Sequence, residues 1–293
     1  MKMTNGDFSR RSMLSLIAGG TASLTLSAPA IAQSSGQGLL DKLRKAGVVK
    51  VAITNDMPYA HLNPDGTVDG VAATITKLCI ERMGIAKMEP IVATYGELVP
   101  GLQAGRWDII GADMTITKAR CEQVSYIDPY TIDSAAFAYV PGAIKDPPKT
   151  LKDVGQSTFK IGMLRGTYML PIVKGKGVKE ENIVIFPDIQ GELQGLLQKR
   201  IDIAFAGSTS LKQMRAQQNN AFTVVHPIPD DVLHGASAAV RKTDTDVLDA
   251  FNAEYRKMKK SGEAKAIIEK FGWEVLPGHT EMTGEKACTE SLI

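Results

Sequence analysis

The sequence predicts an α/β fold built from two units in series. Short β-branched runs alternate with stretches of helical periodicity, and this alternation favours sheets that are mostly parallel. The alternation stops at residues 141–150, a segment rich in Pro, Gly and Lys, and then restarts. A chain of 293 residues suits one large or two small domains. We therefore expect two α/β units, followed by a helical C-terminal region.

The first unit begins at residues 48–54, a short apolar run that is typical of a buried strand. Residues 68–84 follow with helical periodicity and end at Gly84, a residue type that favours helix termination. The remaining elements expected in this unit are a strand at 87–94, a short helix at 96–105 and a strand at 106–113.

The second unit repeats the alternation. Its strands are expected at 159–164, 181–186, 201–206 and 222–228, and its helices at 167–173, 189–200 and 208–218. After an apolar run at 235–240, helices are expected at 243–260 and 263–272. The first of these two has Thr243 and Asp244 as candidates for its N-terminal cap. Its apolar residues recur at spacings of three and four, and they are Val247, Leu248, Phe251, Tyr255 and Met258.

The first 32 residues have the layout of a secretory signal peptide. A basic head with Arg10 and Arg11 precedes an apolar stretch, and Ala30 and Ala32 stand at the A-x-A spacing of a cleavage site. A membrane span needs roughly 20 apolar residues, and this run is shorter and broken by glycine, so a cleaved signal is favoured over an anchor. The adjacent arginines indicate the twin-arginine route, with the general secretory route as the alternative.

Cleavage after residue 32 would leave a chain without net charge. The sequence holds 34 Lys and Arg against 32 Asp and Glu, and residues 1–32 carry three of the bases and one of the acids, which leaves 31 of each. Nucleic-acid binding requires net or clustered basic charge, so nucleic acid is excluded as a partner. The basic, glycine-rich segment 174–180 lacks the pattern of a phosphate loop and is expected to be a solvated turn.

The three cysteines lie in different surroundings. Cys79 falls on the apolar face of the expected helix at 68–84, where a thiol behaves as a small buried hydrophobe. Cys121 and Cys288 lie in polar segments, and export permits disulfides, so we expect these two to pair and one thiol to stay free. The cysteine spacings and the scattered histidines fit no zinc pattern, and we expect no metal and no cofactor.

Ligands of open α/β sheets bind beyond the carboxyl ends of the strands. Five loops meet this condition, and they are 54–62, 94–98, 112–120, 165–170 and 206–211. Arg120 is the expected anion-binding residue, because a guanidinium holds a carboxylate through two parallel hydrogen bonds. Thr115 and Thr117 add donors, and residues 165–167 open a helix whose free N–H groups also favour an anion. The alternative for Arg120 is a surface ion pair.

Acids and aromatic rings in the same loops suit a cationic group. Ion pairing and cation–π attraction would both act there, and the residues concerned are Asp56, Tyr59, Tyr95, Asp113 and Tyr168. The alternative is that the tyrosines are amphipathic core residues and the acids cap turns. The sequence contains no G-x-S-x-G and no H-E-x-x-H motif, so nothing in it requires a reaction, and we expect a protein that is not an enzyme.

Four segments resemble the periplasmic solute-binding proteins of polar amino-acid ABC importers, the proteins of family 3. The segments are 47–71, 96–120, 125–130 and 197–206, and they keep that family's order and spacing. The resemblance runs from about Leu39 to Trp273. The residues "RCEQV" at 120–124 and the tail "FGWEVLPG…TGEKAC" resemble most the subgroup that serves ectoine and hydroxyectoine importers.

This resemblance implies a type II periplasmic binding protein, with two Rossmann-like lobes joined by a two-strand hinge and the ligand in the cleft. The crossings are expected near 133–140 and 233–239. The first lobe would comprise 37–134 and 238–293, and the second lobe 135–237. The protein would be periplasmic and monomeric. It would capture a small carboxylate-bearing zwitterion, an amino acid or an ectoine-like derivative, and deliver it to the transmembrane subunits of an ABC permease.

The resemblance also implies the roles of site residues. Arg120 matches the family's carboxylate-binding arginine, and Tyr59 matches its aromatic shelf. The whole expected ligand-binding set is Asp56, Tyr59, Tyr95, Asp113, Met114, Thr115, Arg120, Thr167, Tyr168 and Gly207. A Cys121–Cys288 bridge would pin the C-terminal tail beside the binding loop.

Two positions depart from the family's pattern. Amino-acid binders usually carry an Asp five residues after the acid that corresponds to Asp202, and this chain has Gly207 there. Asp113 stands where Gly or Ser is usual, so the cation-binding acid is hypothesised to have moved from 207 to 113. Thr115 stands where the ectoine subgroup is expected to have an aromatic residue. The alternative functions are a sensory binding protein and a periplasmic dehydratase of the cyclohexadienyl type, with Asp113 or Asp56 as general acid.

Overall fold

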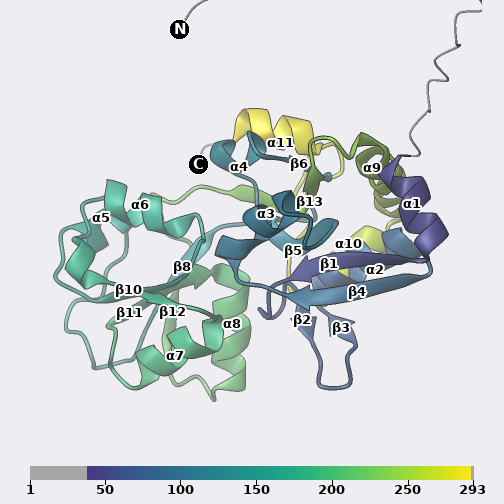
Figure 1. The fold of residues 1–293 in the computed structure, drawn as a ribbon. Coiled ribbons are helices and arrows are strands. Elements are labelled where there is room, and N and C mark those ends of the chain that lie inside the picture. The colour runs from purple at the N-terminus through teal and green to yellow at the C-terminus, as the bar shows by residue number, and fades with distance from the viewer. Residues whose placement is uncertain (1–37, 292–293) are drawn as a thin grey trace, which may run out of the picture. The chain divides into compact units, whose positions relative to one another are not determined.

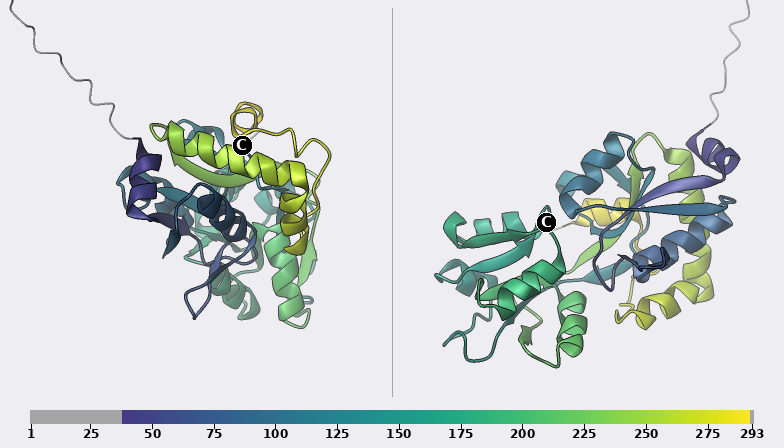
Figure 2. Two further views of the ribbon diagram at one scale, coloured as in Figure 1. Left: turned by 90° about the vertical axis from the view of Figure 1, so that its right-hand side faces the viewer. Right: turned by 60° about the horizontal axis from the view of Figure 1, so that its bottom comes forward.

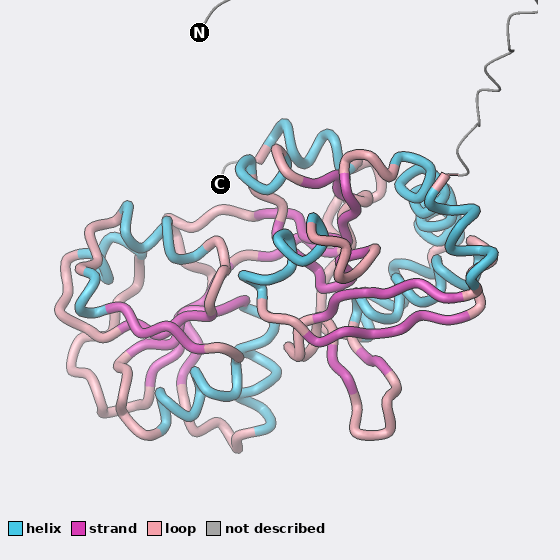
Figure 3. The backbone as a smooth tube through the Cα atoms, in the orientation of Figure 1, coloured by secondary structure: helices cyan, strands magenta, loops and turns pink. Residues whose placement is uncertain are grey.

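The computed structural model describes residues 38–291, and the predicted signal peptide, residues 1–32, lies outside the described residues. The described chain forms two α/β lobes within one structural unit. Each lobe is built on its own sheet, and Figure 3 shows the sheets as two separate groups of magenta strands. Hydrophobic clusters lie on both faces of each sheet, so helices cover both faces.

The first lobe is built on a sheet of strand order β4–β1–β5–β13–β6, with β7 paired to one end of β13. Its strands are β1 (Val48–Ile53), β4 (Lys87–Val92), β5 (Ile109–Thr115), β6 (Val124–Tyr126), β7 (Thr131–Asp133) and β13 (His234–Arg241). The central strand β5 is buried over almost its whole length, as its apolar run predicts. A separate short hairpin pairs β2 (His61–Leu62) with β3 (Val68–Asp69).

Helices α2 (Val71–Arg82), α9 (Thr245–Ser261) and α10 (Glu263–Lys270) pack on one face of this sheet, and α3 (Tyr95–Gln103) packs on the other. Figure 2 shows the long α9, in yellow-green, running across the lobe with α10 joined to its end at an angle. The spacing predicted for α9 is confirmed, because Val247, Phe251, Tyr255 and Met258 are fully buried there. Leu248 is half-buried and packs against the same cluster.

The second lobe is built on a sheet of strand order β10–β9–β11–β8–β12. Its strands are β8 (Ala135–Tyr139), β9 (Ile161–Leu164), β10 (Ile183–Phe186), β11 (Ile203–Gly207) and β12 (Thr223–Val225). One hydrophobic cluster joins this sheet to α5 (Leu151–Gly155) and α6 (Met169–Gly175). The other joins it to α7 (Ile189–Leu197) and α8 (Ser208–Gln217). Figure 1 shows this lobe in teal and green.

Both sheets are mixed, whereas mostly parallel sheets were expected. The strands of the alternating pattern are parallel, namely β4–β1–β5 in one lobe and β10–β9–β11 in the other. Strand β13 is antiparallel to β5 and β6, and β8 is antiparallel to β11 and β12. The physical reason is that β8 and β13 enter their sheets directly from the other lobe. They have no crossover helix, which a parallel neighbour requires.

The chain passes from the first lobe to the second at Ser134, between β7 and β8, and returns through residues 226–233 into β13. The two passages are bonded to each other, because β7 pairs with β13 in a register that places Asp133 opposite His234. This pair of strands forms the two-strand hinge of the fold class. The hinge therefore carries polar side chains at the point where the lobes meet.

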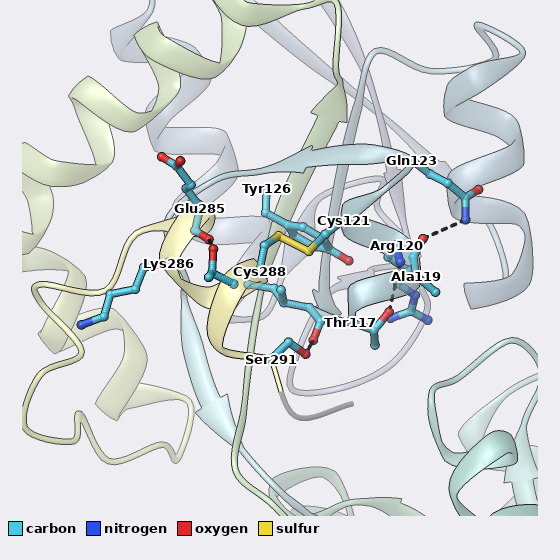
Figure 4. The surroundings of a disulfide bond; sticks show 12 residues. Thr117, Ala119, Arg120, Cys121, Gln123, Tyr126, Glu285, Lys286, Cys288 and Ser291 are labelled. Atoms are coloured by element: carbon cyan, nitrogen blue, oxygen red, sulfur yellow. Dashed lines mark hydrogen bonds between the residues drawn. A yellow bond between two sulfur atoms is a disulfide. The ribbon is translucent and has the colours of Figure 1, made fainter.

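The C-terminal segment is fastened to the first lobe. Cys121 and Cys288 form the expected disulfide, and Cys79 is a buried free thiol. Figure 4 shows the bridge joining α11 (Gly284–Glu290) to α4 (Lys118–Cys121), the short helix that also carries Arg120. The buried Asp128 adds a second attachment, because it pairs with Lys259 at 3.0 Å and accepts a hydrogen bond from the Gly284 N–H at 3.3 Å. The first helix, α1 (Leu39–Ala46), was not predicted.

Candidate functional site

A pocket lies between the two lobes, at the carboxyl ends of the parallel strands. The carboxyl ends of β5, β9 and β11 and the segments that follow β1, β4, β5 and β9 contribute to its wall, together with the two hinge strands. The structure brings nine of the ten expected residues into this wall: Asp56, Tyr59, Tyr95, Asp113, Thr115, Arg120, Thr167, Tyr168 and Gly207. Their contact with a ligand stays a prediction.

Met114 does not join them. Its side chain is fully buried and belongs to the hydrophobic cluster between the first sheet and α3. The cause is the alternation of side chains along a strand, which points Asp113 and Thr115 to the pocket and Met114 to the opposite face.

Arg120 lines the pocket and reaches from the first lobe to the second. Its backbone N–H donates a hydrogen bond to the side-chain hydroxyl of Thr117, the N-cap of α4, at 3.2 Å. Its guanidinium donates from Nη1 to the Thr115 carbonyl at 2.7 Å and from Nη2 to the Gly166 carbonyl at 2.9 Å. A guanidinium carries five N–H donors, so these two bonds leave donors for a carboxylate. Gly166 lies in the second lobe, so Arg120 bonds to both lobes.

Asp56 lies in the loop after β1 and is buried. Its carboxylate accepts hydrogen bonds from the Tyr95 hydroxyl and from Ser210 of α8, each at 3.3 Å. Burial raises its pKa from 3.8 to about 7, and the two hydrogen bonds oppose this rise. Desolvation therefore dominates, and a cation beside Asp56 would favour its ionised form.

Asp113 is also buried and has a positive φ of 50°, an uncommon backbone conformation for a residue other than glycine. Its Oδ2 accepts a hydrogen bond from Thr131 at 2.6 Å, whereas its Oδ1 has no hydrogen-bond partner among residues 38–291. Burial raises its pKa to about 7, and the nearby charge of Asp133 acts in the same direction. An unpartnered carboxylate oxygen in a pocket wall is well suited to a ligand N–H group.

Asp133 is a third acid in the pocket, and the sequence reasoning missed it. It accepts hydrogen bonds from the Ser208 hydroxyl at 2.7 Å, from the Trp273 indole at 3.2 Å and from the Tyr59 hydroxyl at 3.5 Å. Ser208 begins α8 in the second lobe, whereas Trp273 follows α10 in the first. Asp133 therefore joins both lobes at the hinge.

Tyr59 and Gly207 face each other across the cleft. The Tyr59 ring packs against Trp273 with ring centroids 5.1 Å apart, and its hydroxyl lies beside the backbone of Gly207 in the second lobe. A Cβ added at Gly207 would lie 2.0 Å from that hydroxyl, a distance that no side chain tolerates. Position 207 therefore cannot carry the Asp expected from the family resemblance while Tyr59 keeps this position.

Tyr168 packs edge-on against His234 of the hinge, with ring centroids 4.4 Å apart. Its buried hydroxyl has no hydrogen-bond partner among the described residues. Burial raises the pKa of Tyr168 well above 10, so the hydroxyl keeps its proton and can donate a hydrogen bond to an anion. Thr167 beside it uses its hydroxyl on the Leu164 carbonyl at 3.0 Å.

Several lining residues had not been anticipated. They are Thr131, Asp133, Leu164, Met169, Ala206, His234 and Ala236. The signal that could have found Asp133 and His234 is one of position and not of periodicity, because each is a polar residue just before an apolar run, at 135–140 or 235–240, where the chain changes lobe. Residues 38–291 contain no group of three or more His, Cys, Asp or Glu side chains placed to hold a metal ion.

Residues 49–274 match the family of bacterial extracellular solute-binding proteins, family 3, and the chain belongs to this family. It is similar to the probable amino-acid ABC transporter periplasmic-binding protein of Sinorhizobium fredii, with 28% identity over 271 residues and 88% of each chain covered. Proteins of this family bind small amino-acid-like ligands and work with ABC permeases.

Two solved structures are also similar. The complex of EhuB with hydroxyectoine has a TM-score of 0.81 and 31% identity, and the match covers 86% of this chain and 98% of that one. An ancestral amino acid-binding protein, AncCDT-1, is described as a precursor of cyclohexadienyl dehydratase. It has a TM-score of 0.71 and 25% identity, with 80% of this chain and 99% of that one covered.

Proposed function

We propose that the chain captures a small zwitterion outside the cytoplasmic membrane and delivers it to an ABC permease. The observation that carries this proposal is one pocket, shared by both lobes, that holds a single arginine and three carboxylates. Arg120 suits the ligand's carboxylate through parallel N–H donors. Asp56, Asp113 and Asp133, with the rings of Tyr59 and Tyr168, suit its cationic group.

The ligand is an ectoine-like derivative or an amino acid. Similarity to EhuB supports the first, and similarity to the Sinorhizobium fredii protein supports the second. The unpartnered Oδ1 of Asp113 supports a cation that carries N–H groups over a quaternary ammonium, which has no hydrogen to donate.

Capture proceeds by closure of the lobes about the hinge in a monomer. The first lobe comprises 37–134 and 238–293 in this proposal, and the second comprises 135–237. The relatives' periplasmic role supports a periplasmic location here. Within residues 38–291, every helix is too short or too polar to cross a membrane.

A thermal-shift screen tests the ligand class. The chain is unfolded in denaturant, refolded to remove bound ligand, and mixed with ectoine, hydroxyectoine, the common amino acids, glycine betaine and arogenate. A ligand at about 1,000 times its dissociation constant adds roughly 4 kcal/mol of stability, which is on the order of 10 °C for a chain of this size. A shift with ectoines or with amino acids identifies the class. A shift with glycine betaine alone, or with no zwitterion, contradicts the proposal.

Binding without turnover is part of the proposal. The alternative of a dehydratase rests on the similarity to AncCDT-1 and on two carboxyl groups with pKa values near 7, which suit general acids. Incubation with arogenate or prephenate, followed by absorbance of the aromatic product, separates the two. Product formed in proportion to the amount of protein would establish that the chain is an enzyme.

Deleting the gene tests the alternative of a sensory binding protein. If the chain serves a receptor and not a permease, the deletion would abolish taxis to the ligand but leave its uptake intact.

A further inference from the structure

The two lobes bond directly to each other in this structure. Arg120 of the first lobe donates to the Gly166 carbonyl of the second at 2.9 Å. Ser210 of the second lobe donates to the Met57 carbonyl of the first at 2.9 Å. These bonds hold the cleft in a closed arrangement, and they would break when the lobes separate.

Beside the Arg120 bond, the backbones of two glycines meet across the cleft. Gly96 lies in the first turn of α3, and Gly166 lies in the loop after β9. A Cβ added at Gly166 would lie 2.3 Å from both the Cα and the backbone N of Gly96, whereas real Cβ atoms essentially never approach within 3.0 Å. The obstacle is backbone in a helical turn, which cannot rotate away as a side chain can.

Of these two residues, Gly166 is the one that must be glycine, whereas Gly96 has room for a side chain. A Cβ added at Gly96 would lie 3.7 Å from the Gly166 Cα and 3.8 Å from the Arg165 Cγ, which is ordinary van der Waals contact. Gly166 also has a positive φ of 77°, a conformation that side chains other than glycine rarely adopt. The collision at Gly166 exists only while the lobes are closed, whereas the φ requirement belongs to its own loop.

We infer that Gly166 permits closure of the cleft. Because it has no side chain, the lobes can close far enough for its carbonyl to reach Arg120. The apparent affinity of a binding protein falls in proportion to the fraction of chains able to adopt the binding-competent state. A side chain at 166 would lower that fraction while every predicted ligand-contacting side chain stays in place. This inference concerns the closed state itself and does not depend on which zwitterion the pocket takes.

The test compares Gly166→Ala with Gly142→Ala. Gly142 lies in an exposed turn of the same lobe, has the same φ of 77° and has nothing within 4 Å of an added Cβ. It therefore reproduces the backbone strain without the collision. Calorimetric titration with hydroxyectoine should show binding about ten- to a hundredfold weaker in Gly166→Ala and unchanged in Gly142→Ala. Small-angle scattering with saturating hydroxyectoine should show a larger radius of gyration in Gly166→Ala alone.

A second substitution separates strain from collision at the same position. Asn tolerates a positive φ better than Ala, but its side chain meets the same backbone. Gly166→Asn should therefore bind as weakly as Gly166→Ala, and recovery in Gly166→Asn would overturn the inference. Equal affinity in Gly166→Ala and the unchanged chain would also overturn it.

Folding and ligand identity are checked separately. Thermal unfolding of the ligand-free variants should give equal midpoints for Gly166→Ala and Gly142→Ala, because the open form carries no collision. An unchanged chain that ignores hydroxyectoine would count against the ectoine-like ligand only. The same variants are then compared with the panel compound that stabilises the chain most. That comparison confirms or overturns the role of Gly166 in closure.

Discussion

The hydroxyl of Tyr59 occupies the space that a side chain at residue 207 would need. An added Cβ at Gly207 would lie 2.0 Å from the hydroxyl oxygen and 3.1 Å from the adjoining ring carbon. Tyr59 belongs to the first lobe and Gly207 to the second, so their fit depends on closure. The absence of a side chain at 207, where the family resemblance leads us to expect Asp, thus leaves room for the Tyr59 hydroxyl, which donates a hydrogen bond to Asp133 at 3.5 Å.

Gly207→Ala should weaken ligand binding about tenfold or more, because the methyl group must displace the Tyr59 hydroxyl from the closed cleft. Gly207 has a φ of −58°, so alanine brings no backbone strain there. Calorimetric titration measures the effect. Gly175→Ala is the matched control, since nothing lies within 4 Å of a Cβ added at Gly175. Equal loss of affinity in both variants would show that the Tyr59 contact has no role.

Asp113→Asn should weaken the binding of a cationic ligand by roughly ten- to a hundredfold, because hydrogen bonds to charged groups contribute about 1.5–3 kcal/mol. The substitution keeps the shape of the side chain, and Asn also tolerates the φ of 50° found here. Competition binding with the ligand identified in the screen measures the change. Asp65→Asn, in the exposed hairpin turn between β2 and β3, is the control. Unchanged affinity in Asp113→Asn would remove Asp113 from the cation site.

Affinity for a cationic ligand should rise as the pH rises from about 6 to about 8. Burial raises the pKa values of Asp56 and Asp113 from 3.8 to about 7, so both are partly protonated near neutrality without ligand. A cation binds their ionised forms, and binding therefore releases protons. Titrations in two buffers of different ionisation enthalpy count these protons. A flat profile, with no proton release, would contradict the predicted coupling.

While the cleft keeps Asp56 and Asp113 buried as in this structure, the stability of the ligand-free chain should change with pH in the opposite direction. The unfolded chain loses its protons near pH 3.8, whereas folded Asp56 and Asp113 keep theirs up to about pH 7. Their contribution to the free energy of unfolding is therefore fully present below the lower value and is lost as the pH rises through the upper one. Denaturant unfolding at about pH 5 and pH 8 measures it. A double Asp56→Asn, Asp113→Asn variant should reduce the difference.

Loss of the disulfide should lower the free energy of unfolding by about 2–5 kcal/mol, because the bridge closes a loop with a sequence separation of 167. Cys121→Ser with Cys288→Ser removes it, and Cys79→Ser, which leaves the bridge intact, is the control. Arg120 immediately precedes Cys121 in α4, so the double variant should also weaken carboxylate binding. Thiol titration of the unfolded, unreduced chain should find one free thiol among three cysteines. A result of three would exclude the bridge.

The parts of the fold that follow local patterns could be predicted from the sequence. The alternating strands and helices and the apolar spacing in α9 are properties of short segments, and periodicity reports them directly. The direction of β8 and β13 could not be predicted in this way, because it depends on where the chain changes lobe. The same limit explains why α11 was missed, since a disulfide and the buried Asp128 hold this short polar helix.

Prediction of the site was also limited because contacts between residues distant in the sequence leave no local pattern. Loops at the carboxyl ends of strands were recognisable, and Asp56 and Arg120 both lie in the pocket wall. Asp133 was missed because a single acid within a strand has no periodic signature, and its partners Ser208 and Trp273 are distant in sequence. Met114 adjoins two residues of the pocket wall in the sequence, but strand alternation turns its side chain away from the pocket.

The position of β13 determines the order in which the chain can complete its two lobes. The strands of the second sheet all come from residues 135–225, so this sheet has every strand as soon as β12 has been synthesised. The first sheet has β13 between β5 and β6, so it remains divided until residues 234–241 have left the ribosome. A nascent chain that ends before β13 therefore holds one complete lobe and an interrupted one, and its pocket has only one finished wall.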